Sequence, residues 1–123
     1  MKIKVIILEP SKRAIIREIG NDLESMQRVV GGNIEVICPF DDEVCLVCNE
    51  EGKITGLPLN RAIYNNKGNI MDIIAGAAFI CDCSKVYFQS LKPQHVDKYL
   101  EKFQYPEAFV SVNGDIIAIP IIG

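Results

Sequence analysis

The pair Asn60-Arg61 offers the most specific chemistry in the chain. It comes just after Pro58, which ends a predicted strand. An arginine at such a position can present its planar guanidinium group to a carboxylate or a phosphate through two parallel hydrogen bonds. The alternative is a structural ion pair with the acidic residues upstream, which is the more common role, and the sequence leaves both interpretations open.

Two pairs of adjacent acidic residues could supply a general acid and a general base, or bind a hard cation. They are Asp41-Asp42 and Glu50-Glu51, and each pair lies in a predicted turn. Adjacent acids in turns usually face solvent or accept hydrogen bonds from backbone amides, so we expect no catalytic residue here. The residues that we predict to contact a ligand or a partner are Asn49, Glu50, Glu51, Asn60, Arg61 and Asp72.

Four of the five cysteines form two closely spaced pairs, as in some structural zinc sites. Cys45 and Cys48 are three residues apart, and Cys81 and Cys83 are two apart. Residues three apart in a strand face opposite sides of the sheet, and neither pair has the glycine-rich turn that would bring both thiolates to one ion. We therefore expect buried, reduced thiols, with neither a metal nor a cofactor.

His95 is the chain's one histidine, and a nucleophilic thiol would need it as a general base. It lies off the apolar stripe of a predicted helix, so we expect an exposed side chain rather than a catalytic partner. The sequence also lacks a Gly-x-Ser-x-Gly nucleophile elbow, a His-Glu-x-x-His zinc motif and a phosphate-binding loop. Hydrolases and kinases of the usual kinds are thereby disfavoured.

Negative charge is concentrated in residues 33–52, which contain several acidic residues but no lysine or arginine. The whole chain has a formal net charge of -3. Such a segment repels nucleic-acid phosphates, and aromatic and basic residues do not interleave as a base-stacking surface requires. We therefore expect no direct nucleic-acid binding.

The apolar runs are too short for a signal peptide or a membrane span. The run near the N-terminus is interrupted by Glu9-Pro10, and the longest run covers residues 73–81. We expect a cytoplasmic protein without membrane contact, in which the cysteines stay reduced.

The 123 residues, of which 49% are hydrophobic, suit one domain with one core. Two helices are predicted. One begins in Asn21-Asp22-Leu23-Glu24, where the cap residue Asn21 is followed three residues later by Glu24, and it ends at Gly31-Gly32. The other begins at Pro93 and carries an apolar stripe to Phe103. Apolar patterning predicts strands over residues 3–8, 14–19, 34–38 and 44–48.

The middle of the chain gives further predictions. Residues 53–57 should return antiparallel to residues 44–48 through a turn at residues 49–52. Residues 60–64 should form a single helical turn, and residues 73–81 should form one strand.

Asn113-Gly114 predicts a hairpin between residues 109–112 and 115–119. The apolar segment 116–122 is either a strand docked on the sheet or a dimer contact. Because strands and helices do not alternate with long crossovers, we predict a single α+β domain. It should contain a mostly antiparallel sheet of about five to seven strands and two helices.

Several short segments extend over about residues 5–80, and among them Asn49-Glu50-Glu51-Gly52 and Leu59-Asn60-Arg61 are specific when taken together. The segments are residues 5–10, Leu23-Glu24-Ser25-Met26-Gln27, Val30-Gly31-Gly32, residues 34–36, Pro39-Phe40-Asp41-Asp42, residues 46–53, residues 56–61 and residues 72–76. This set resembles the domain of unknown function 3846 family. The predicted helix and hairpin of about residues 90–120 match less clearly.

The resemblance implies no established activity, because the family is uncharacterised. It implies a protein carried by phages, plasmids or conjugative elements in an accessory or host-interaction role. We therefore predict a non-catalytic binding protein that engages a protein partner or a small ligand, with a homodimer as a further option. Two alternatives stay open: a small enzyme that acts on a nucleotide-like anionic substrate held by Arg61, and an acidic decoy in host-defence evasion formed by residues 33–52.

Overall fold

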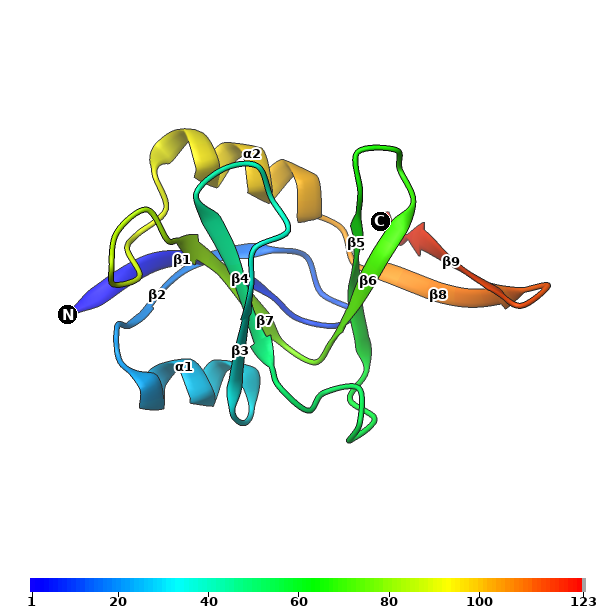
Figure 1. The fold of residues 1–123 in the computed structure, drawn as a ribbon, viewed down its shortest axis with the longest axis horizontal. Coiled ribbons are helices and arrows are strands. Elements are labelled where there is room, and N and C mark those ends of the chain that lie inside the picture. The colour runs from blue at the N-terminus through cyan, green and yellow to red at the C-terminus, as the bar shows by residue number, and fades with distance from the viewer. Residues whose placement is uncertain (123) are drawn as a thin grey trace.

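The computed structural model describes residues 1–122, and its centre is a five-stranded antiparallel sheet (Figure 1). The strand order is β2-β1-β7-β4-β3, and every neighbouring pair is antiparallel. These strands are β1 (Lys2–Leu8), β2 (Ile15–Gly20), β3 (Ile34–Ile37), β4 (Val44–Asn49) and β7 (Ala78–Asp82). The mostly antiparallel α+β class predicted from the sequence is confirmed.

One helix covers each face of this sheet, with α2 (Pro93–Phe103) above and α1 (Leu23–Val30) below in Figure 1. Alternate side chains of the central strands therefore enter two different cores. Cys45 and Val47 of β4 pack on the α1 side, whereas Val44 and Leu46 pack on the α2 side. This double burial explains why β1, β4 and β7 are almost continuously apolar.

The helix ends lie at the sequence signals, except that α1 is capped by Asp22 and not by the predicted Asn21, whose side chain instead donates to the Phe88 carbonyl at 3.0 Å. Asp22 caps α1 by accepting a 2.7 Å hydrogen bond from the Ser25 N–H, and Gly31 ends it in the left-handed conformation, with φ of 78°. Pro93 lies in the first turn of α2, where its missing N–H has no helical partner to lose.

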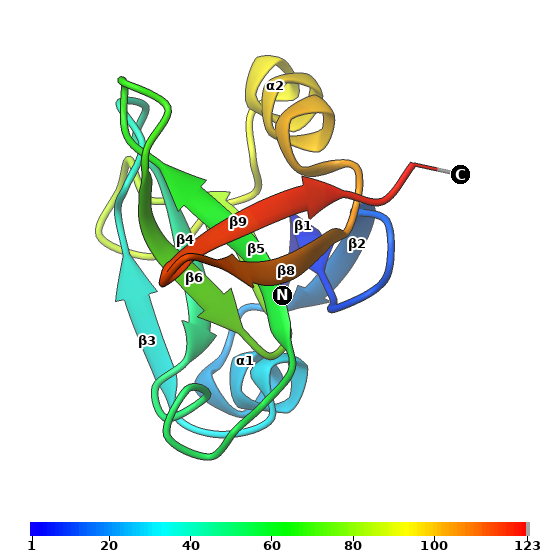
Figure 2. The same ribbon diagram turned by 90° about the vertical axis from the view of Figure 1, so that its right-hand side faces the viewer.

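Two hairpins complete the fold beside the main sheet (Figures 1 and 2). The first pairs β5 (Leu59–Tyr64) with β6 (Ile70–Ala75) and places Ile63 and Ile74 in the core below α2. The second pairs β8 (Glu107–Val112) with β9 (Asp115–Pro120) through the predicted turn at Asn113-Gly114. Both turn residues have positive φ, as a two-residue hairpin of this kind requires.

The prediction that residues 53–57 form a strand is wrong. Residues 50–56 form consecutive turns, in which the N–H of Leu57 donates to the carbonyl of Gly52 at 2.8 Å. The reason is that β4 lies inside the sheet, where β3 and β7 already occupy both of its edges. No edge of β4 is left for a returning strand.

Two further element predictions are wrong. Residues 60–64 are not a helical turn but most of β5, because they pair with β6, a partner that local sequence does not reveal. Residues 73–81 are not one strand but the end of β6 and most of β7. Gly76, with φ of 82°, reverses the chain between them, and its N–H donates to the Pro58 carbonyl at 2.7 Å.

Within residues 1–122, neither helix is long and apolar enough to cross a membrane.

The loop between β4 and β5 lies close against β6 at Gly52. A Cβ atom at this position would come within 2.5 Å of the Ala75 carbonyl oxygen. Since the obstacle is backbone rather than a flexible side chain, the loop would have to move away from β6. Gly52 therefore sets the distance between the loop and the strand.

We expect Gly52→Ala to lower the free energy of unfolding by roughly 2–3 kcal/mol, because the added methyl meets the backbone of β6. Gly56→Ala in the same loop is the matched control, since its position has a φ of 73° but open space around it. It should cost only about 1 kcal/mol, for the left-handed conformation. Urea unfolding of both variants measures the difference, and a smaller loss for Gly52→Ala would contradict the close packing of this loop.

Candidate functional site

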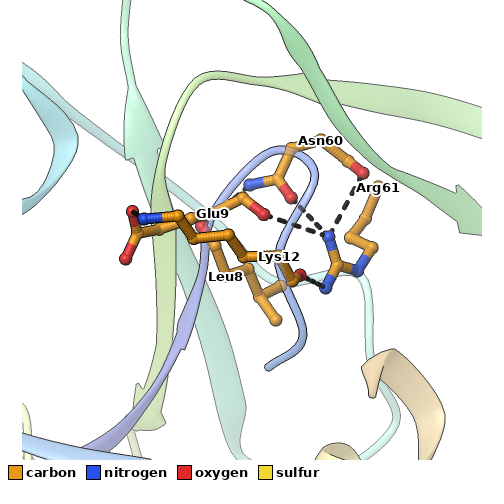
Figure 3. Close-up of polar contacts among 5 residues, drawn as sticks. All are labelled: Leu8, Glu9, Lys12, Asn60 and Arg61. Carbon is orange, nitrogen blue, oxygen red and sulfur yellow. Dashed lines mark hydrogen bonds and ion pairs between the residues drawn. The ribbon is translucent and has the colours of Figure 1, made fainter. Parts of the chain in front are cut away.

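The structure places Asn60 and Arg61 in the interior, where Arg61 is 1% exposed (Figure 3). The Arg61 guanidinium donates to the carbonyl oxygens of Lys12 at 2.7 Å, Phe103 at 3.1 Å and Glu9 at 3.4 Å, and to Oδ1 of Asn60 at 2.8 Å. No carboxylate forms an ion pair with it in the described part of the chain. The predicted alternative of an ion pair with the acidic residues upstream is therefore wrong.

Asn60 completes this group of hydrogen bonds from the other side. Its Nδ2 donates to the carbonyl oxygens of Leu8 at 2.8 Å and Gly76 at 2.9 Å. Burial lowers the pKa of Arg61, and the negative charge of Glu107 acts in the opposite direction. Both side chains direct these hydrogen bonds to other residues of the chain, so we assign Asn60 and Arg61 a structural role rather than ligand contact.

Three of the other four predicted residues meet at an acidic pocket of about 210 Å³ beside the β4–β5 loop. Its lining comes from β3, β4, the loop and β6. The polar lining residues are Glu35, Cys48, Asn49, Glu50, Lys53 and Asp72. The pocket thus combines Asn49, Glu50 and Asp72 from the prediction, whereas Glu51 lies outside its lining.

Asn49 shapes the pocket rather than offering its side chain to a ligand. Its Nδ2 donates to the Val30 carbonyl at 3.1 Å, and its Oδ1 accepts from the N–H of Glu51 at 2.8 Å. The N–H of Glu50 donates to the Asn33 carbonyl at 2.8 Å. These bonds hold the start of the loop against the end of α1, and they leave the Glu50 carboxylate as a pocket wall.

Negative charge dominates the pocket. Glu35, Glu50 and Asp72 contribute carboxylates, and Lys53 is the one basic residue in the lining. Lys53 Nζ contacts Asp72 Oδ1, which also accepts a 2.8 Å hydrogen bond from the N–H of Ile73. With one carboxylate paired, Glu35 and Glu50 remain to attract a cation.

Cys48 lies at the base of the pocket, with its Sγ 3.8 Å from Oε1 of Glu35. Burial, followed by the charges of Glu35 and Asp72, raises the pKa of this thiol to about 11. The thiol is therefore protonated near pH 7 and is a poor nucleophile there.

The other thiols follow the predicted orientation. Cys45 packs on the α1 side of β4 and Cys48 on the α2 side, so the prediction that they face opposite ways is confirmed. Cys45 instead lies next to Cys81 on the neighbouring strand, with Sγ atoms 3.6 Å apart. Among residues 1–122 no three side chains of the metal-ligating types are arranged to hold an ion.

The prediction that His95 is exposed is wrong, because its side chain is only 14% exposed. Its Nε2 lies 3.7 Å from Oδ1 of Asp42, whose other oxygen accepts hydrogen bonds from Lys98 at 2.6 Å and Tyr99 at 2.7 Å. The Lys98 and Tyr99 donors hold the pKa of Asp42 below its usual value. Asp42 therefore holds the β3–β4 loop against α2, and the histidine lies next to this carboxylate rather than next to a thiol.

Sequence reasoning missed Glu35, Cys48 and Lys53 as members of the pocket. A signal existed for the first two, because an antiparallel pairing of the two predicted strands puts Glu35 directly opposite Cys48. Lys53 was unpredictable in this role, since it was assigned to a strand that does not form.

We expect Arg61→Ala to lower the free energy of unfolding by about 3–5 kcal/mol, because several buried carbonyl oxygens lose their donor. Arg61→Lys should recover only part of this loss, since a single ammonium cannot reach all the acceptors. Arg28→Ala is the control: its exposed ion pair with Glu24 should contribute less than about 1 kcal/mol. Chemical denaturation monitored by circular dichroism measures all three, and equal losses for Arg61→Ala and Arg28→Ala would exclude the structural role.

The pKa of Cys48 predicts its reactivity. The thiolate is the form that reacts with iodoacetamide, so at about pH 8.5 Cys48 should be modified much more slowly than the exposed Cys38. Glu35→Gln removes a negative charge beside Cys48, so it should lower the pKa and speed modification of Cys48 but not of Cys38. Peptide mass spectrometry of timed samples gives both rates. An unchanged Cys48 rate in Glu35→Gln would show that access alone limits the reaction.

Comparison with known proteins gives a family match. The family model described as Domain of unknown function (DUF3846) matches residues 1–104. No curated protein and no solved structure matches the chain. The match extends past the segments on which the sequence resemblance rests and includes α2, whereas β8 and β9 follow it. Because the model covers most of its length, the chain belongs to the DUF3846 family.

Proposed function

We propose that this protein is a non-catalytic binding protein whose acidic pocket receives a basic side chain of a protein partner. The observation that carries the proposal is the charge of the pocket. Its lining brings together Glu35, Glu50 and Asp72 with Lys53 as the one basic residue. A lysine or arginine entering between these carboxylates gains favourable electrostatic interactions at a partly desolvated position.

The size of the pocket supports a single side chain rather than a whole metabolite. Its volume is about 210 Å³. Pockets for drug-sized ligands are larger, roughly 300–1,000 Å³. At the rim, Ile54 is 86% exposed and offers an apolar contact for the methylene groups of an entering lysine or arginine.

Lys53 acts as an internal competitor in this proposal. In the free protein its ammonium group neutralises Asp72. An entering cation competes with Lys53 for the same carboxylate, so Lys53 weakens binding and favours partners that supply additional contacts.

The enzyme alternative finds little support in the arrangement of the residues. It requires Arg61 to hold an anion next to a carboxylate base, yet Arg61 is buried and binds backbone carbonyls. Glu50 and Asp72 line a different cavity from Arg61. The cavity of about 110 Å³ that Arg61 does line contains Glu101 and Glu107, and Glu107 accepts hydrogen bonds from Ala62 and Tyr64.

The decoy alternative requires the acidic residues of segment 33–52 to form one surface. Asp42 and Glu50 lie at opposite ends of β4, and Asp42 is paired with Lys98 of α2. A divided set of charges imitates a phosphate backbone poorly.

The biological setting is part of the same proposal. The resemblance to a family of proteins carried by mobile elements supports an accessory role toward a host protein. The five cysteines form no disulfide among the described residues, which supports a location in a reducing cytoplasm. A partner that presents an exposed lysine or arginine fits the acidic pocket, whereas direct nucleic-acid contact does not.

The proposal is tested by titrating the isotopically labelled protein with N-acetyl-arginine amide and N-acetyl-lysine amide and recording amide NMR shifts. We expect saturable shifts confined to residues 48–54 and 72–75, with a Kd on the order of millimolar for one such group. N-acetyl-alanine amide, which lacks the cation, should cause none. Added salt should weaken the binding.

Variants separate the charge mechanism from general surface binding. Glu50→Gln should weaken arginine binding several-fold, and Lys53→Met should strengthen it because the internal competitor is gone. Glu24→Gln, an exposed acid on α1, is the matched control and should change nothing. Shifts that are absent, or that persist unchanged in Glu50→Gln, would rule out the pocket as a cation site.

A further inference from the structure

The β8–β9 hairpin extends away from the main sheet and follows the family-matched residues 1–104 (Figures 1 and 2). It is fastened through β8. Glu107 accepts hydrogen bonds from the Ala62 N–H at 2.8 Å and from the Tyr64 hydroxyl at 3.3 Å, which holds β8 near β5. The outer edge of β9 has no neighbouring strand among residues 1–122.

The register of the hairpin shows which backbone groups occupy that outer edge. Residues that flank a two-residue turn exchange both backbone hydrogen bonds, and bonded and non-bonded pairs then alternate along the hairpin. Val112 and Asp115 flank this turn, and the 2.7 Å bond from the Ile121 N–H to the Pro106 carbonyl continues the alternation. The N–H and C=O groups of Ile116 and Ala118 therefore point away from β8, toward the outer edge.

The side chains of this edge are apolar on both faces. Ile116 is 51% exposed on one face, and Ile119 is 48% exposed on the other. Residues 116–122 contain no charged residue. Exposed edge strands normally carry charges or a bulge that prevents pairing with another chain. β9 has neither, apart from the missing N–H of Pro120 at its end.

A groove lies next to β9. It has a volume of about 580 Å³, and its lining combines Ile70, Ile73, Ile116 and Ile117 with the polar residues Asn69 and Asp115. A strand that paired with β9 would therefore place some of its side chains against isoleucines as well as forming backbone hydrogen bonds.

We propose that the outer edge of β9 binds β9 of a second copy of this chain, antiparallel, about a two-fold axis beside Ala118. In this register the N–H of Ile116 donates to the Pro120 carbonyl of the partner subunit, and Ala118 pairs with Ala118 of the partner subunit. Ile117 then lies opposite the partner's Ile119. The outward N–H groups of Ile116 and Ala118 all acquire acceptors, and the two hairpins become one four-stranded sheet.

The occupant is a second copy because the edge is self-complementary. It is neutral from residue 116 onward, and its one charged residue, Asp115, lies at the end of the strand, so two copies meet without opposing like charges at the axis. In a two-fold contact each copy uses the outer edge of its β9 for the other copy, so the contact closes on itself and the assembly through β9 ends at a dimer. One strand pair with its groove buries less than the standard interface of about 800 Å² per partner, so the dimer should be weak, with a Kd in the micromolar range.

Sedimentation velocity from about 5 µM to about 500 µM tests the proposal, since a weak dimer depends on concentration. We expect the mass to rise from monomer to dimer over this range, and the amide protons of Ile116 and Ala118 to exchange more slowly as the dimer forms. A chain that stays monomeric throughout, or a dimer in which these two amides remain unprotected, would overturn the proposal.

Edge variants identify the surface. Ile116→Lys introduces a charge at the contact, and Ala118→Pro removes an outward N–H without removing a bond to β8. Each should raise the Kd at least tenfold, about 1.4 kcal/mol or more. Val86→Lys, which changes an apolar residue that is 95% exposed elsewhere, should leave the Kd unchanged. An unchanged unfolding midpoint for Ile116→Lys confirms its fold, and a parental Kd for both edge variants would refute the assignment.

Glu50→Gln, a change in the acidic pocket, should dimerise with the parental Kd. The test of the dimer is therefore independent of the test of the pocket.

Discussion

The fold depends on a buried guanidinium group that has no carboxylate partner. Arg61 divides its hydrogen bonds among backbone carbonyls of the β1–β2 turn and the C-terminal end of α2. Such carbonyls carry partial negative charge, and the last carbonyls of a helix have no helical donors of their own. One side chain thus satisfies acceptors from segments far apart in sequence, and it fixes β5 relative to the main sheet and to α2.

This constraint positions the acidic pocket at a distance. With β5 held by Asn60 and Arg61, β6 follows through its pairing with β5, and Asp72 is placed opposite Ile63. The loop between β4 and β5 then spans from the main sheet to this hairpin and approaches β6 at Gly52. The pocket forms where that loop, β3 and β6 meet, so its geometry depends on residues that do not line it.

The two surfaces differ in chemistry, and therefore in the partners that they suit. The acidic pocket is small, charged and built from residues within the family-matched region. The edge of β9 is apolar and neutral, and it follows that region. Electrostatic attraction falls with added salt, whereas backbone pairing and apolar burial depend on it little. A binding protein that pairs through β9 would present two pockets to one partner or assembly and would gain affinity from the pair.

The sequence by itself determined the elements whose signals are local. Capping, turn chemistry and apolar patterning act within a few residues. These local signals account for α1, the Pro93 start of α2, the Asn113-Gly114 hairpin and the strands β1, β3 and β4. The tertiary structure alone decided the rest. Residues 60–64 became a strand only by pairing with β6, and Gly76 separated β6 from β7 where the apolar pattern is continuous. The tertiary structure also gave Arg61 a structural role in place of ligand contact, because burial and hydrogen-bond satisfaction depend on residues distant in sequence. The same long-range packing brought Glu35 and Lys53 to the pocket.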